Sequence, residues 1–155
     1  MGYVQELRAL VGNRPLILVG SVVIVRNEEG KILLQQRRSP HGVWGLTGGL
    51  MELGESTEQV ARREVYEETG LTLGTLSLMD VYSGEDQYSK VENGDEFYVV
   101  TTVYHTQEYS GILRRNEESL QLAFIDPEAL PDRMVGSHRN MIQAFLSKQK
   151  QPRPD

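Results

Sequence analysis

The stretch GGLMELGESTEQVARREVYEETGL, residues 48 to 71, joins a glycine pair to an acidic segment that carries the signals of a helix. Ser56 can cap the start of that helix, because Gln59 follows three residues later in the capping-box position. Gly70 stands where a helix commonly ends. The stretch therefore predicts a glycine-rich approach followed by a helix over residues 57–69.

The predicted helix carries glutamates at three neighbouring positions, Glu64, Glu67 and Glu68. At about 100° per residue, these side chains span roughly 100° of arc on the same side as the valines of the helix. An acidic run is usually a solvated helix face, but a solvated face would lie opposite the valines. Carboxylates on the face that packs against the protein cost several kcal/mol unless they are neutralised or protonated.

The helix itself does not supply a positive partner for these carboxylates. No lysine occurs in residues 57–69, and the helical spacing predicts that Arg62 and Arg63 point to the other side. A bound hard cation is then the natural partner, and carboxylates without histidine or cysteine favour magnesium or manganese over zinc. Gly48 and Gly49 would let backbone approach a metal or phosphate, although a simple turn also explains Gly48.

Composition places the chain among globular proteins and narrows its partners. Its 155 residues fit one domain, residues 1–155, with 39% hydrophobic and 25% charged residues. The net charge of −6 argues against stable nucleic-acid binding. The chain has no cysteine, which excludes disulfides and suits the cytoplasm. The apolar run 15–25 is too short to span a membrane and is typical of a buried strand.

The rest of the chain predicts a mixed α/β order. Two strands over residues 16–26 and 31–36 are expected to form a hairpin around the turn NEEG. A stripe of apolar residues predicts a C-terminal packing helix, and residues 148–155 are expected to be a frayed tail. The stripe of this helix consists of Met141, Ile142, Phe145 and Leu146. Further strands are predicted over residues 73–81, 97–105 and 120–125, with a tight turn at Asn93-Gly94.

The spacing of the acidic stretch resembles a known motif. It reads as Gly49, five residues, Glu55, seven residues, and then REVYEETGL from Arg63 to Leu71. This matches every fixed position of the Nudix box, so the chain resembles the Nudix hydrolases. The segments GSVVIVRNEEGKILLQQRR and GVWGLTGGL are also similar to the family, and the resemblance covers most of the chain. One departure is Thr47, where many members have proline before the two glycines.

The resemblance implies both a fold and a reaction. The fold would be an α/β/α sandwich around a mixed β-sheet. The reaction would be the hydrolysis of a nucleoside diphosphate linked to another group X, with Mg²⁺ or Mn²⁺ as cofactor. By the same resemblance the metal ligands would be Glu64, Glu67 and Glu68, together with the backbone carbonyl of Gly49.

The resemblance also implies supporting and catalytic roles. Arg63 would hold Glu64 in place with help from Glu55, since an oriented carboxylate is a better ligand and proton acceptor. Glu64 is the first candidate for activating the water that attacks phosphorus. Other members take the base or a further ligand from a later loop, where this chain offers Glu117 and Glu118. We prefer Glu118, although two solvated surface acids explain the pair equally well.

Group X stays open at this stage. Nucleoside triphosphates, ADP-ribose and other nucleotide sugars, dinucleotides and diadenosine polyphosphates all fit the motif. Three kinds of side chain could contact such substrates, and each has an ordinary alternative: the aromatic rings could simply pack, the basic groups could be solvated, and the histidines look too scattered for a metal set. The aromatic residues are Trp44, Tyr82, Tyr88 and Tyr98, the basic residues are Arg37, Arg38 and Lys90, and the histidines are His41, His105 and His138.

Two other classes of function compete with the enzyme. One is a nucleotide sensor that uses the same fold to bind without turnover, and the other is a structural domain stabilised by metal. Silent members of the family typically lack glutamates or the arginine of the box, and this chain has all of them. A small-molecule nucleotide is the expected partner, and a homodimer is a further expectation from the resemblance.

Overall fold

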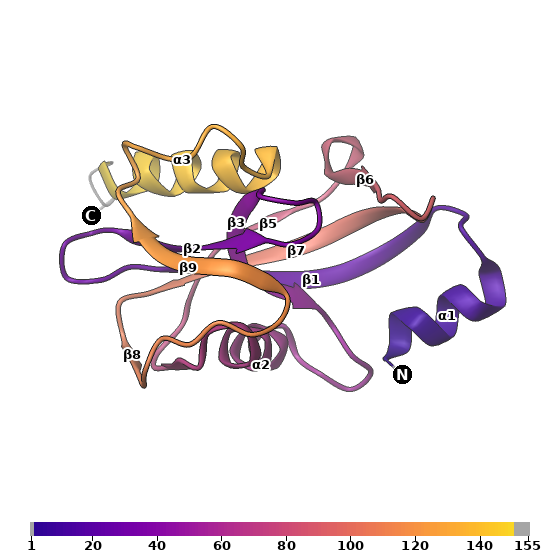
Figure 1. The fold of residues 1–155 in the computed structure, drawn as a ribbon, viewed down its shortest axis with the longest axis horizontal. Coiled ribbons are helices and arrows are strands. Elements are labelled where there is room, and N and C mark those ends of the chain that lie inside the picture. Colours follow the sequence, from indigo (N-terminus) through magenta and orange to yellow (C-terminus); the bar gives the residue numbers. More distant parts are fainter. Residues whose placement is uncertain (1, 151–155) are drawn as a thin grey trace, which may run out of the picture.

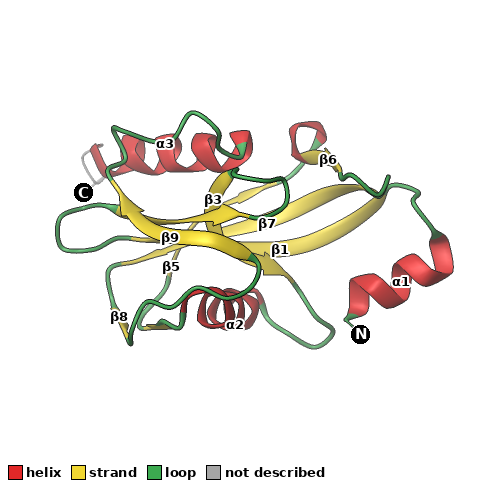
Figure 2. Cartoon of the chain, viewed as in Figure 1, coloured by secondary structure: helices red, strands yellow, loops and turns green. Residues whose placement is uncertain are grey.

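The computed structural model describes residues 2–150, in which a β-sheet lies between two helices (Figure 1). Helix α2 covers one face and helix α3 the other, while α1 stands beside the sheet (Figures 1 and 2). This layering confirms the α/β sandwich. The elements are α1 (Tyr3–Val11), β1 (Leu16–Val25), β2 (Ile32–Arg37), β3 (Trp44–Leu50), α2 (Thr57–Thr69), β4 (Thr72–Leu73), β5 (Ser77–Tyr82), η1 (Glu85–Gln87), β6 (Tyr88–Lys90), β7 (Glu96–Thr106), β8 (Tyr109–Ser110), β9 (Ser119–Ile125) and α3 (Gly136–Lys150).

The large sheet is mixed and has the order β5-β7-β1-β3-β2-β9, with β6 paired to β7. Strand β1 lies parallel to β7 and antiparallel to β3. Its register places Ser21 opposite Gly49 and Val22 opposite Gly48, so the glycine pair lies at the centre of the sheet. The run predicted to be a buried strand is therefore the central strand of the fold.

The predicted hairpin between the first two strands is wrong. The turn is present, because Gly30 donates its N–H to the carbonyl of Asn27, but beyond it the segments are joined only by the bond from the Asn27 N–H to the Lys31 carbonyl and by a single bridge between Arg26 and Ile32. Strand β3 then lies between β1 and β2 and pairs with both. The turn is local, whereas the choice of strand partner depends on a segment about 20 residues later in the chain.

Several other boundaries also differ from the expectations. The predicted strand over 73–81 is divided into β4 and β5, and the short strands β6 and β8 and helix α1 were not anticipated. The turn at Asn93-Gly94 is confirmed, since Gly94 has φ 93° between β6 and β7. Helix α3 continues through Lys150, so the expected fraying is wrong for residues 148–150, and residues 151–155 lie outside the described part.

Two apolar layers hold the helices against the sheet. The α3 layer includes Met141, Ile142 and Phe145, each nearly or wholly buried, with Leu146 packed at its edge, which confirms the predicted stripe. The α2 layer joins the helix to the other face of the sheet through Val65 and its neighbours. Burying a large apolar side chain contributes about 1.5–3 kcal/mol, so these layers fix where α2 and α3 lie.

Helix α2 begins and ends at the residues that the sequence predicts. The Ser56 hydroxyl accepts a hydrogen bond from the Gln59 N–H at 3.1 Å, and the Gln59 side chain accepts one from the Ser56 N–H at 2.8 Å. This reciprocal pair is the predicted capping box. Gly70 has φ 78° and ends the helix. The glutamates of the helix are therefore held at defined positions along its axis.

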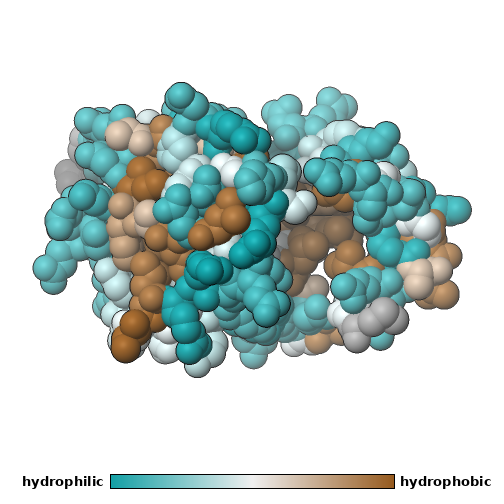
Figure 3. All heavy atoms as spheres, viewed as in Figure 1, coloured by the Kyte–Doolittle hydropathy of each residue, from teal (hydrophilic) through white to brown (hydrophobic). Residues whose placement is uncertain are grey.

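Helix α1 is attached mainly by polar contacts and has no buried residue. The Tyr3 N–H donates to Glu52 Oε2 at 2.9 Å. Farther along, Arg8 donates to the carbonyl of Glu96 and lies 3.7 Å from a carboxylate oxygen of Asp95. An apolar hollow of about 220 Å³ separates α1 from the sheet (Figure 3). No helix within residues 2–150 is both long and apolar enough to cross a membrane.

Candidate active site

Glu68 is the most deeply buried carboxylate of the acidic stretch, with 5% of its surface exposed. Its Oε1 accepts a hydrogen bond from the Gly48 N–H at 2.8 Å. Burial raises the pKa of Glu68 to about 8; repulsion from Glu64 and Glu118 adds to this rise, and the Gly48 hydrogen bond and the charge of Arg37 oppose it. The protein therefore holds a carboxylate in a place that disfavours its charge.

The glycine pair lets the carboxylates lie directly against strand β3. A Cβ on Gly49 would be 2.4 Å from Cδ of Glu64, and one on Gly48 would be 2.1 Å from the carbonyl oxygen of Ser21. Any side chain at either position would collide with the site or with the neighbouring strand. The sequence predicted a close approach here, and the groups that approach are the Glu64 carboxylate and strand β1.

Arg63 gathers the acidic groups around one guanidinium. It donates from Nε and Nη2 to the two oxygens of Glu55, at 2.7 and 2.8 Å, and from Nη1 to Glu64 Oε1 at 2.8 Å. A further bond of 3.1 Å joins Nη2 to the carbonyl of Leu50. The predicted direction of Arg63, away from the carboxylates, is wrong, because its long side chain folds back across the helix. Arg62 does lie apart and donates to the carbonyl of Leu73.

These bonds set the charges of Arg63 and its partners. The hydrogen bonds that Arg63 donates to Glu55 lower the pKa of Glu55 and raise the pKa of Arg63, so the pair stays ionised. For Glu64, burial raises the pKa and the bond from Arg63 opposes the rise. Glu55 also accepts the Glu52 N–H at 2.8 Å, which anchors it to the loop before α2. Glu55 thus contacts the arginine that orients Glu64, as expected of a positioning residue.

Glu67 departs from the expected inward face of the helix. Its side chain is 54% exposed and receives only a 3.3 Å hydrogen bond from Arg63 Nη1. Glu67 lies at the edge of the inward arc of the wheel, and the residues that follow it, Glu68 and Thr69, are buried, so the arc predicted from the sequence is too wide. Within residues 2–150 no three histidine, aspartate or glutamate side chains converge as a formed metal site. The ligand set of Glu64, Glu67, Glu68 and Gly49 therefore stays a prediction.

The loop before β9 brings two more carboxylates to the same place. A cavity of about 420 Å³, here called the carboxylate cavity, opens beside Glu68. Asn116 ties the loop to α2, because its side-chain amide donates to the carbonyl of Glu67 at 3.1 Å and its Oδ1 accepts the Glu118 N–H at 2.9 Å. Sequence reasoning did not find Asn116. The lining residues are Gln35, Arg37, Arg38, Ser39, Glu68, Glu117 and Glu118.

Arg37 has no ion-pair partner among the described residues. Its guanidinium makes no hydrogen bond or ion pair with any of residues 2–150, and burial lowers its pKa while the charge of Glu68 opposes that shift. It lines the carboxylate cavity and also a second cavity on the α3 side of the sheet. Desolvated guanidinium groups bind phosphate strongly when one is present. Arg37 therefore marks where an anionic ligand can be received.

The second cavity, here called the sheet cavity, has a volume of about 220 Å³ and continues from the glycine pair. None of the four aromatic residues considered above lines either cavity: Trp44 and Tyr82 pack against the α3 layer, and Tyr88 packs on Tyr98. The aromatic residue that lines the sheet cavity is Phe97, which the sequence analysis did not single out. The lining residues are Gly20, Ser21, Val22, Arg37, Leu46, Gly48, Gly49, Leu50, Ser89, Phe97, Val99, Thr101, Val135, Ser137 and His138.

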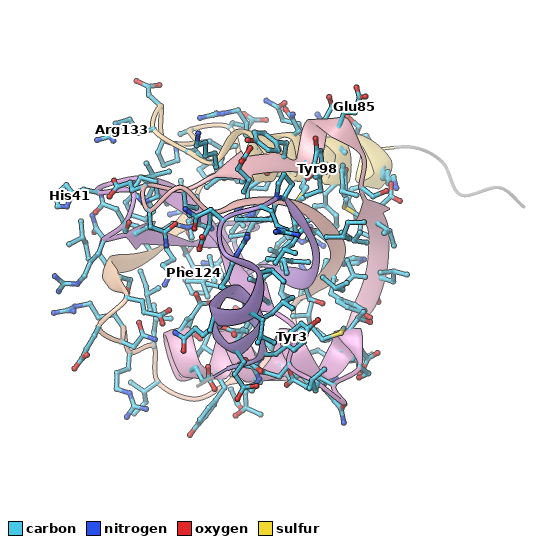
Figure 4. The ribbon with its side chains drawn as sticks, turned by 90° about the vertical axis from the view of Figure 1, so that its right-hand side faces the viewer. Tyr3, His41, Glu85, Tyr98, Phe124 and Arg133 are labelled. Atoms are coloured by element: carbon cyan, nitrogen blue, oxygen red, sulfur yellow. The ribbon has the colours of Figure 1, made fainter. Side chains whose placement is uncertain are left out.

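The three histidines lie in three different surroundings. His41 projects from the edge of the molecule (Figure 4), and His105 packs on the ring of Phe145 at 4.9 Å. His138 lies in the wall of the sheet cavity, where its Nδ1 accepts the Leu46 N–H at 3.0 Å. Burial, with a smaller effect of Arg37, lowers the pKa of His138 to about 3.

Thr47, which departs from the family pattern, is buried in β3 opposite Val23. Its hydroxyl makes no hydrogen bond with the described residues. An unsatisfied buried hydroxyl costs about 1–3 kcal/mol, so Thr47 weakens the strand rather than adding a contact to the site.

Comparisons with known proteins identify the family of the chain. A family model described as NUDIX domain matches residues 17–145. An ADP-ribose pyrophosphatase from Methanocaldococcus jannaschii is 28% identical over 85% of this chain and 73% of its own length. A putative 8-oxo-dGTP diphosphatase from Bacillus subtilis is 31% identical over 81% and 78%. The crystal structure of a MutT NUDIX hydrolase from Burkholderia pseudomallei superposes with a TM-score of 0.72 at 28% identity, over 83% of this chain and 98% of that one.

Proposed function

Because the chain belongs to the Nudix hydrolase family, which acts on pyrophosphate bonds, we propose that it cleaves a nucleoside diphosphate linked to a group X, with Mg²⁺ as cofactor. The observation that carries this proposal is the buried carboxylate of Glu68 and the partly buried carboxylate of Glu64, which pack against the glycine pair beside a cavity that Arg37 also lines. Relatives that act on ADP-ribose and on 8-oxo-dGTP support the nucleotide class of substrate.

The donor set fits a hard divalent cation. Glu68 has no hydrogen bond from any cationic group in the described chain, and burial raises its pKa, helped by repulsion from Glu64 and Glu118, which the charge of Arg37 offsets only in part. Carboxylate and carbonyl oxygens suit Mg²⁺ or Mn²⁺. In this proposal Glu64, Glu67, Glu68 and the Gly49 carbonyl hold the ion. A cation bound there would supply Lewis-acid activation of water and neutralise phosphate oxygens.

The remaining steps belong to the protein's own side chains. Glu64 accepts the proton of the attacking water, and Arg63 keeps that carboxylate oriented through the bonds it shares with Glu55. Glu118 is the alternative proton acceptor, since its loop borders the carboxylate cavity. Arg37 receives a phosphate oxygen and offsets the repulsion between an acidic protein and an anionic substrate. A cytoplasmic location and a homodimer stay predictions.

One experiment tests the proposed reaction. The purified protein is incubated with Mg²⁺ and a panel of nucleoside triphosphates, nucleotide sugars and dinucleotides, and the products are identified by mass. We expect at least one member to be cleaved at a pyrophosphate bond. Glu68→Gln should lower turnover by at least a hundredfold, whereas Glu58→Gln should not, because Glu58 is exposed and pairs only with Arg62.

The result that would overturn the reaction is the absence of turnover across the whole panel. Tight binding of one panel member without turnover would instead identify a nucleotide sensor. Full activity in a folded Glu68→Gln protein would remove Glu68 from the proposed ligand set.

A further inference from the structure

The ring of His138 has a defined tautomer. Its Nδ1 accepts the Leu46 N–H at 3.0 Å, and a nitrogen that accepts a hydrogen bond carries no proton. The ring is neutral at physiological pH, so the proton must be on Nε2. Only 8% of the residue is exposed. His138 therefore presents one N–H group whose direction is held by strand β3.

This N–H group has no partner in the described protein. Within residues 2–150 the only hydrogen bond of the His138 side chain is the one that Nδ1 accepts. The residue lines the sheet cavity, and Nδ1 is occupied by the backbone, so the edge that faces the cavity includes Nε2. Nε2 is not among the fully buried polar atoms that lack a partner, so its N–H is open to the cavity, where an acceptor on a ligand can bond to it.

The other polar groups of the cavity define what the ligand must offer. No carboxylate or side-chain amide lines the sheet cavity, and Arg37, like neutral His138 at Nε2, can only donate. The serine and threonine hydroxyls are adaptable, and the hydroxyl of Ser21 is already bonded to Thr57 and Thr102. Phe97 and Val99 supply apolar wall. The cavity thus favours a flat group that presents hydrogen-bond acceptors.

We propose that His138 selects the nucleobase by donating from Nε2 to a ring carbonyl oxygen, at the position where adenine and cytosine carry an amino group. The enzyme then prefers guanine and uracil nucleotides, because an exocyclic amino group would meet a second donor. This inference rests on the proposed function, since it places the base of the substrate in the sheet cavity and its phosphates beside Arg37.

The test compares KM and kcat for GTP against ATP and for UTP against CTP. His138→Asn keeps an oxygen that can accept the Leu46 N–H but removes the donor at the Nε2 position. We expect KM for GTP and UTP to rise about tenfold with little change in kcat, and KM for ATP and CTP to stay within about twofold. His138→Gln, whose amide reaches the Nε2 position, should recover part of the preference. His41→Asn, at an exposed histidine outside both cavities, is the matched control.

Binding without turnover separates this inference from the proposed reaction. The wild-type protein is titrated calorimetrically with GMP, AMP, UMP and CMP, none of which contains a pyrophosphate bond. Tighter binding of GMP than AMP, and of UMP than CMP, supports the base preference even if no triphosphate is cleaved. Equal binding within each pair, or an equal loss for all four in a folded His138→Asn protein, would overturn it.

Discussion

The buried imidazole of His138 makes a quantitative prediction about stability and pH. Its folded pKa is about 3, against an ordinary value of 6.5. Between these two values the unfolded chain binds the proton and the folded protein does not, so the free energy of unfolding falls as pH decreases through 6.5. Each pH unit below the unfolded pKa costs about 1.4 kcal/mol, which amounts to about 2 kcal/mol at pH 5. The loss continues until about pH 3.

The prediction is measured against His138→Asn, which removes the titrating group and can still accept the Leu46 N–H. Urea unfolding of both proteins at pH 7.5, 6 and 5, without divalent cations, gives the free energies. Other groups titrate equally in both proteins, so they cancel in the difference. Wild type should lose about 2 kcal/mol relative to the variant between pH 7.5 and 5. Parallel pH profiles would show that His138 is protonated in the folded protein, contrary to this reasoning.

Two further substitutions test contacts at and near the site. Arg63→Lys removes the pair of hydrogen bonds that Arg63 donates to the two oxygens of Glu55. With Mg²⁺ and any accepted nucleotide, kcat should fall about 10- to 100-fold while the melting temperature changes little. An unchanged kcat would contradict the orienting role of Arg63. Thr47→Val replaces an unsatisfied hydroxyl by a methyl of similar volume, and should raise the free energy of unfolding by about 1 kcal/mol in urea titrations. A lower value would mean that the hydroxyl is satisfied.

The contrast between helix α2 and strand β2 explains what could be predicted from the sequence. The bounds of α2 depend on Ser56, Gln59 and Gly70, which interact with backbone within four residues of themselves. The partner of a strand depends on segments far along the chain, and here β3 intervenes between β1 and β2. The turn at residues 27–30 is therefore correct, whereas the hairpin is wrong. A hydrophobic pattern indicates that a strand is buried but not which strand lies beside it.

The same distinction applies to the site. Glu64 and Glu68 could be identified because a fixed spacing on one helix brings them together. His138 and Phe97 come from α3 and β7, and they meet in one cavity only through the register of the sheet. The position of Arg63 was misjudged because a side chain with several rotatable bonds can cross to the other side of its helix. Spacing along one element is readable from sequence, whereas convergence of several elements is not.

The attachment of helix α1 has a practical consequence for handling this protein. Glu52 accepts the Tyr3 N–H and donates its own N–H to Glu55. Glu55 in turn accepts a hydrogen bond from Arg63, which also donates to Glu64. The first turn of α1 is thus a few hydrogen bonds away from Glu64, the proposed proton acceptor. We therefore expect a purification tag fused ahead of Tyr3 to change kcat, because these hydrogen bonds connect the first turn of α1 to Glu64. Kinetic constants should accordingly be compared only between preparations that share the same leading sequence.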